Sequence, residues 1–126
     1  MQNLIIEKTY STPLIKFESD TGKLMISGES FPENASRFYT PVLQWIRDYV
    51  KELSSQKAEV TFEISYFNSS TSKVFMNIFG ILDEAAEDGK DIVVNWLCSK
   101  DNESALECGE EFKEDLEKLQ FNIIEF

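Results

Sequence analysis

Two adjoining stretches of the chain carry hydrophobic patterns of different period, and a polar turn lies between them. In the first stretch every second residue is apolar, as in a strand with one buried face: Val60, Phe62, Ile64 and Tyr66. In the second stretch apolar residues recur at helical spacing from Val74 to Ala86, and Gly89 supplies a stop. The pattern therefore predicts a strand, a turn over residues 66–73 and a helix.

Similar patterns over the rest of the chain predict further strands and helices. The strand segments are 3–6, 14–17, 24–27, 58–67, 92–97 and 121–124. The helical segments are 35–53, 71–88 and 103–118. Pro41 leaves two interpretations open for the first helix, which either begins near Thr40 or bends at the proline. The residues from Gly28 to Asn34 are predicted to form a loop.

The order of these elements predicts the fold class. The chain has an N-terminal β-hairpin and then alternating helices and strands, which is typical of a single α/β domain with helices packed on a mixed sheet. The continuous apolar run 92–97 indicates a buried parallel strand. Sites in such sheets lie at the carboxyl ends of strands, where the next helix begins. The turn 66–73 is such a place.

The turn contains more hydroxyl and amide groups than a helix start requires. Asn68, Ser69, Ser70 and Thr71 can each cap the helix, whose first N–H groups lack internal partners. A phosphate on one of these hydroxyls would be stabilised by those N–H groups and by the helix dipole. The simpler interpretation is that they are only helix caps. Composition alone favours this simpler interpretation, but one cap uses one side chain, and the surplus of such groups counts against it.

Composition limits the chemistry that the chain can perform. Its 126 residues suit one domain, and 42% are hydrophobic and 13% aromatic, as in a folded protein. The chain has no histidine, which removes the commonest general base and metal ligand and excludes Ser-His-Asp catalysis. Cys98 and Cys108 fit reduced thiols better than a disulfide. We therefore expect no metal, no cofactor and no catalytic site.

Charge and hydropathy limit the location and the partners. No apolar run approaches the roughly 20 residues that span a bilayer, and the N-terminus lacks a signal-peptide pattern, so a cytoplasmic protein without membrane insertion is expected. The net charge of −11 disfavours nucleic acid and anionic membranes as partners. Residues 101–118 hold eight acidic and two basic residues. This segment either steers a basic partner or is simply a solvated helix face.

Four stretches in order resemble one bacterial family. They are Thr12-Pro13 with Gly22 and Gly28; Ser30-Phe31-Pro32-Glu33-Asn34 with Phe38-Tyr39, Pro41 and Trp45; Tyr66-Phe67-Asn68-Ser69-Ser70 with Lys73; and Trp96 with Leu106-Glu107, Gly109-Glu110 and Phe112. Their order and spacing resemble the SiaC-type regulatory phosphoproteins, whose fold is similar to STAS domains, the anti-sigma factor antagonists. The resemblance implies a partner-switching protein that controls biofilm formation or aggregation. A kinase and a phosphatase would set its state, and the unmodified form would activate a diguanylate cyclase that makes cyclic di-GMP.

The resemblance also implies which residues form the site. The family's phosphorylated residue is a threonine directly after asparagine, and the matching position here is Ser69, with Ser70 and Thr71 as the fallback sites. Serine keeps the hydroxyl, although a threonine-selective kinase would discriminate against it. The residues expected to contact the partner are Phe67, Asn68, Ser69, Ser70, Lys73, Phe31, Glu33 and Asn34. Lys73 would either pair with the phosphate or stay solvated.

Two other functions use the same sequence features differently. An anti-sigma factor antagonist would present the same turn to an ATP-containing anti-sigma kinase. A small acidic enzyme or ligand carrier is disfavoured, because no Gly-rich phosphate loop, metal cluster or nucleophile-base pair is present.

Overall fold

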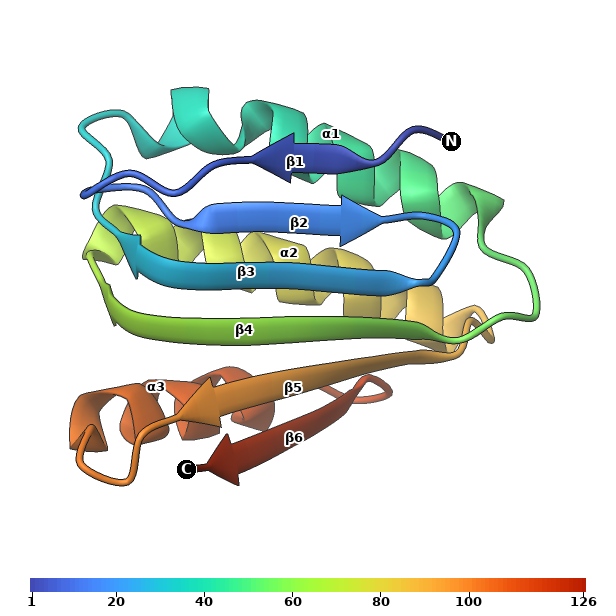
Figure 1. Cartoon of the computed structure of the whole chain (residues 1–126). Coiled ribbons are helices and arrows are strands. Elements are labelled where there is room, and N and C mark those ends of the chain that lie inside the picture. Colours follow the sequence, from blue (N-terminus) through green and yellow to red (C-terminus); the bar gives the residue numbers. More distant parts are fainter.

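The sheet has six strands that lie side by side in their order along the chain. The computed structural model describes residues 1–126 (Figure 1). The strands are β1 (Leu4–Ile6), β2 (Leu14–Glu18), β3 (Lys23–Ser30), β4 (Ala58–Phe67), β5 (Ile92–Cys98) and β6 (Gln120–Glu125). The pairs β1–β2 and β2–β3 are antiparallel, whereas β3–β4, β4–β5 and β5–β6 are parallel. The predicted mixed α/β architecture is confirmed.

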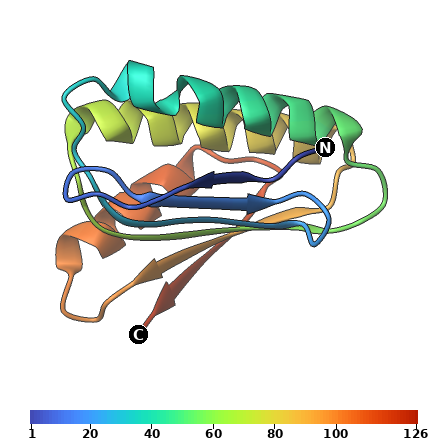
Figure 2. The ribbon, with the colours of Figure 1, turned by 45° about the horizontal axis from the view of Figure 1, so that its top comes forward.

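Each parallel connection contains one helix. The helices are α1 (Ala35–Glu52), α2 (Ser69–Glu87) and α3 (Glu103–Glu114). Figures 1 and 2 show all three on one face of the sheet, so the other face is left without a covering layer. Each helix follows the carboxyl end of a parallel strand, and the three helix N-termini therefore lie at one end of the molecule. No helix is long and apolar enough to cross a membrane.

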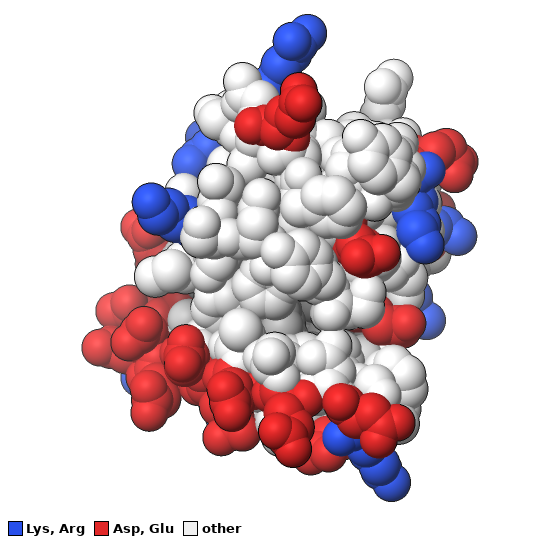
Figure 3. All heavy atoms as spheres, turned by 90° about the vertical axis from the view of Figure 1, so that its left-hand side faces the viewer, with Lys and Arg blue, Asp and Glu red and all other residues white.

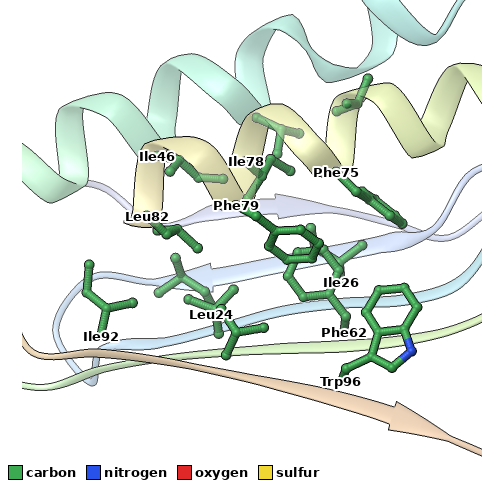
Figure 4. Packing of buried hydrophobic residues seen from close by; sticks show 14 of the residues in the cluster. Leu24, Ile26, Ile46, Phe62, Phe75, Ile78, Phe79, Leu82, Ile92 and Trp96 are labelled. Atoms are coloured by element: carbon green, nitrogen blue, oxygen red, sulfur yellow. The ribbon is translucent and has the colours of Figure 1, made fainter. Parts of the chain in front are cut away.

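The core lies between the sheet and the helices (Figure 4). Inward-facing strand residues such as Phe62 and Trp96 pack against Phe75 and Phe79 from α2, with Phe62–Phe79 ring centroids 4.9 Å apart. Phe112 of α3 lies 5.4 Å from the Trp96 ring by centroids. Burial of these rings removes a large apolar area from water, and edge-on contacts between them add further stabilisation.

Strand β3 is longer than predicted and reaches Ser30, so the expected loop from Gly28 is shorter. Gly28 pairs with Ile64, but the next residue, Glu29, pairs with Tyr66, which leaves Ser65 as an extra residue in β4. Gly28 has a φ of 118°, which glycine adopts without strain. An extra residue reverses the alternation of side chains beyond it. The prediction that Tyr66 is buried was therefore wrong, since its side chain is 53% exposed.

The predicted start of the first helix at residue 35 is confirmed, whereas α2 begins at Ser69 rather than at residue 71 and α3 ends earlier than predicted. Helix α1 begins at Ala35 and contains Pro41 in its interior, so a start near Thr40 was wrong. Helix α3 ends at Glu114 rather than near residue 118. The Asp83 carboxylate of α2 accepts hydrogen bonds from the backbone N–H groups of residues 117, 118 and 119, which turns the chain toward β6. Desolvation raises the pKa of Asp83, but the three donors together hold it below its usual value.

Gly109 allows α3 to approach the sheet closely. A Cβ atom at this position would lie 2.6 Å from Cδ1 of Trp96, whose ring is fully buried. The Trp96 indole N–H donates to the backbone carbonyl of Ala105 at 2.9 Å, so the ring is held on the same helix by a hydrogen bond. Neither partner has room to move away from an added methyl group.

We expect Gly109→Ala to lower the free energy of unfolding by about 1–3 kcal/mol through overpacking, although alanine favours helices by about 1 kcal/mol. The matched control is Gly80→Ala in α2, where an added Cβ meets no atom within 4 Å. This control should gain up to about 1 kcal/mol, because alanine restricts the unfolded chain. Urea unfolding measures both, and equal stabilisation by the two changes would contradict the proposed contact with Trp96.

Candidate functional site

The three helix N-termini at the carboxyl end of the sheet are each capped by an asparagine. Asn34 accepts from the N–H of Arg37 at 3.0 Å, Asn68 from that of Thr71 at 3.0 Å, and Asn102 from that of Ala105 at 3.1 Å. Each side chain satisfies one N–H group that has no partner within the helix. The cap of α2, which the sequence left open among four residues, is thus Asn68.

Ser69 and Ser70 are the first two residues of α2, and both are exposed. Since Asn68 provides the cap, their hydroxyls are not needed to start the helix. The Asn68 backbone also fixes the start of α2 against β3, because its N–H donates to the Ser30 carbonyl at 3.1 Å. The two serines therefore project from a helix start that other groups hold in place.

Thr71 differs from the two serines because it is fully buried. Its hydroxyl lies 2.9 Å from the hydroxyl of Ser30 and donates to the Ser30 backbone carbonyl at 3.1 Å. Ser30 is also fully buried, and its hydroxyl lies 2.7 Å from that of Tyr39 in α1. Burial raises the pKa of Tyr39 to about 12, with the Ser30 hydrogen bond acting in the opposite direction. Of the three predicted hydroxyls, Thr71 is thus the one that is buried and hydrogen-bonded in the folded protein, whereas Ser69 and Ser70 are accessible.

The other predicted contact residues divide between surface and interior. Glu33, Asn34 and Lys73 are exposed, although the Asn34 side chain is engaged in capping α1. Phe31 is half-buried. Phe67 faces inward, with its ring 5.4 Å from that of Phe75 by centroids, and so presents less surface than expected.

Sequence reasoning missed the two residues that extend this surface, Tyr10 and Tyr66. The Tyr66 ring is 5.8 Å from that of Phe31, and Phe31 is 6.2 Å from Tyr10. The alternating pattern placed Tyr66 on the buried face, since nothing local signals the extra residue in β4. Tyr10 carries no periodic signal because it lies in the connection between β1 and β2.

The sequence profile of the SiaC family regulatory phosphoproteins matches residues 6–126. The chain belongs to this family. It is 32% identical over 115 residues to an uncharacterized protein of Pseudomonas aeruginosa (strain UCBPP-PA14), with 91% of this chain and 90% of that protein covered.

Solved structures of the family have the same fold. SiaC of Pseudomonas aeruginosa matches with a TM-score of 0.91 at 29% identity, over 100% of both chains. A chain in the crystal structure of the diguanylate cyclase SiaD in complex with its activator SiaC, from the same bacterium, matches with a TM-score of 0.91 at 31% identity, over 98% of this chain and 99% of that chain. The predicted resemblance to SiaC-type proteins is confirmed.

The charge distribution around the site of this SiaC-family chain is uneven. Figure 3 views the end where the helices begin, and shows a largely uncharged centre with acidic side chains gathered along the part where α3 lies. The exposed acidic residues of α3 are Glu103, Glu107, Glu110, Glu111 and Glu114. Lys73 is the one basic residue of α2.

No group of three or more His, Cys, Asp or Glu side chains could hold a metal ion.

We expect Thr71→Val to lower the free energy of unfolding by about 1–3 kcal/mol, because the buried hydroxyl of Ser30 loses one partner while the shape is kept. Thr40→Val is the matched control, since Thr40 is also in a helix but is exposed and bonded only to the Ser36 carbonyl. Its effect should stay within about 0.5 kcal/mol. Denaturant unfolding measures the difference, and equal effects would show that the buried hydroxyls contribute little.

Proposed function

We propose that this chain is a non-enzymatic partner-switching regulator whose unmodified form binds and activates a diguanylate cyclase, and that phosphorylation of Ser69 ends this binding. The supporting observation is the pair of exposed hydroxyls, Ser69 and Ser70, at a helix start that Asn68 already caps. The related SiaC of Pseudomonas aeruginosa is described as the activator of the cyclase SiaD. Control of cyclic di-GMP would make the chain a regulator of biofilm formation.

The phosphoryl chemistry comes from other proteins. A kinase transfers the γ-phosphoryl group of ATP to the Ser69 hydroxyl oxygen, which loses its proton, and ADP leaves. A phosphatase then hydrolyses the ester with water, which returns the serine hydroxyl and inorganic phosphate. The chain contributes an accessible hydroxyl, and the surrounding fold fixes where that hydroxyl lies. Of the two exposed serines, Ser69 directly follows the capping asparagine, which is the position of the family's phosphorylated threonine.

The fold can accept a phosphate at this position. The group adds roughly −1.5 to −2 charges and three acceptor oxygens. The N–H groups of Ser69 and Ser70 belong to the first turn of α2, where backbone donors lack partners within the helix. Because Ser69 is exposed, interaction with the positive end of the helix dipole is worth about 0.3–1 kcal/mol at low ionic strength. Lys73, one turn further along, either pairs with the phosphate or stays solvated.

A partner that packs on the unmodified turn would not accept the phosphate equally well. The dianion would have to lose water at the interface without gaining a cation in exchange. A loss of about 3 kcal/mol weakens binding roughly a hundredfold, because each 1.4 kcal/mol corresponds to about tenfold. Phosphorylation can therefore release the partner while the domain stays folded.

The first prediction is the position of the modification. The cognate kinase should add one phosphate, and peptide mapping by mass spectrometry should place it on Ser69. Ser70→Ala is the matched control, because it removes the other exposed hydroxyl and should still accept the phosphate. Modification chiefly at Ser70, or outside residues 66–73, would overturn the assignment.

The second prediction is the direction of the switch. Ser69→Ala should fold, resist phosphorylation and still bind and stimulate the cyclase, because an exposed hydroxyl that is not the cap contributes little to stability. The phosphorylated wild-type protein should bind about a hundredfold more weakly in calorimetry. Equal affinity of the two forms would show that Ser69 is not the switch. Binding to an anti-sigma kinase instead of the cyclase would assign the chain to the anti-sigma factor antagonists.

A further inference from the structure

Three aromatic side chains form a continuous row on the surface beside the proposed switch. The aromatic row consists of Tyr10, Phe31 and Tyr66, whose neighbouring rings meet edge to face at 6.2 Å and 5.8 Å. Tyr10 is 85% exposed and Tyr66 is 53% exposed. Contiguous exposed apolar side chains often mark interaction sites, and tyrosine is enriched among the residues that dominate binding at interfaces.

Hydrogen bonds tie together the backbone segments that carry Tyr10 and Phe31. Tyr10 lies at the tip of a turn closed by the hydrogen bond from the N–H of Thr9 to the carbonyl of Thr12, at 3.0 Å. The Thr9 hydroxyl accepts from the N–H groups of Ser11 and Thr12 within the same turn. The N–H of Phe31 donates to the Ser11 carbonyl at 2.8 Å, which ties the turn to the end of β3. A preformed surface loses less conformational entropy on binding than a flexible one.

A hollow of about 310 Å³ lies among β3, β4 and β5, and residues next in the chain to Tyr66 and Glu29 line it. Ser65 and Gly28, which are next to Tyr66 and its strand partner Glu29, belong to its lining. Leu97 and Phe126 supply apolar wall, while Glu63 and Lys8 supply one charge of each sign. The hollow has room for one large side chain of a partner. The row and the hollow together form a surface that continues from the α2 N-terminus onto the uncovered sheet.

Acidic residues border this surface. Glu29 pairs with Tyr66 across the strands, and Glu33 follows Phe31 by two residues. The α3 cap, Asn102, donates to the Ser65 carbonyl at 2.9 Å, which brings its exposed neighbours Asp101 and Glu103 to the same border. Charge of this sign disfavours a second copy of the chain, which also carries −11, and disfavours the phosphates of nucleic acid or lipid.

We infer that the aromatic row and the adjoining hollow are the docking surface for the diguanylate cyclase, through a cyclase segment that presents apolar side chains flanked by lysine or arginine. This inference rests on the proposed function and adds to it the location and the chemistry of the contact. Tyr10 and Tyr66 bury apolar area against the segment, and the acidic border pairs with its basic residues. The position next to Ser69 explains how one phosphate weakens the same contact, since a hydrated dianion would have to be desolvated where the apolar side chains of the partner pack.

The test compares binding of the purified cognate cyclase to wild-type protein, Tyr10→Ala, Tyr66→Ala and the double variant, all unphosphorylated. Each single change should weaken binding about tenfold or more, mainly through faster dissociation. Tyr10→Phe and Tyr66→Phe should retain most of the affinity, because they keep the ring. Met76→Ala is the matched control, since Met76 is 54% exposed but lies on α2 beside α3, and it should leave binding unchanged. Thermal unfolding should be the same for all variants.

Association rates at different salt concentrations test the acidic border separately. Glu29→Gln with Glu103→Gln should slow association at low salt and reduce its dependence on ionic strength, with little change in dissociation. Affinities of the tyrosine variants within twofold of wild type would overturn the docking surface while leaving the proposed function intact. Wild-type protein that does not bind the cyclase at all would overturn both. A dimer of the chain that Tyr66→Ala dissociates would assign the row to self-association and overturn the inference.

Discussion

The parallel pairing of β3 with β4 determines how the functional end of this domain is built. It brings Ser30, at the end of β3, against the first turn of α2, where the Ser30 carbonyl accepts from both the Asn68 N–H and the Thr71 hydroxyl. The Ser30 hydroxyl extends the contact to Tyr39 of α1. Because these groups are buried, leaving any of them without a partner is costly, and the geometry of the turn is strongly constrained.

Because of that constraint, four consecutive residues divide into two that hold the helix start and two that stay exposed. Asn68 caps the helix, Thr71 anchors it to β3, and the two serines between them remain exposed. A helix start that depended on the serine hydroxyls would lose its cap on modification. With the cap supplied by Asn68, the helix start does not depend on the serine hydroxyls, as the proposed switch requires.

The surface around the turn has two components that act on binding in different ways. The aromatic rings offer apolar area at short range, which affects how long a complex persists. The acidic side chains of α3 and of the strand ends act over a Debye length of about 10 Å at 0.1 M salt, and so affect how often partners meet. A phosphate on Ser69 would add to the negative field and also require desolvation at the contact. The first effect favours a basic partner, so release depends on the second effect, which is local and is screened less by salt.

The element order was predictable from sequence, because it depends on periodic patterns that are local to each segment. Residues 58–67 and 92–98 form strands close to the predicted bounds, and the hydroxyl-rich turn lies where the strand period gives way to the helical one. The family resemblance supplied Ser69 within that turn. These features depend only on residues that are close together in the sequence, so they can be predicted from the sequence alone.

The roles of individual side chains depended on contacts between distant segments. Only the register of β3 on β4 shows that Ser65 is an extra residue, which exposes Tyr66 and turns Phe67 inward. Only the contact with Ser30 distinguishes the buried Thr71 from the exposed Ser69 and Ser70, since all three fit the same turn by local preference. Likewise, α3 ends before residues 117–119, whose N–H groups donate to the Asp83 carboxylate of α2. The sequence by itself determined the elements and the place of the site, whereas tertiary packing decided which side chains face the solvent, because burial and long-range hydrogen bonds arise only when separate segments meet.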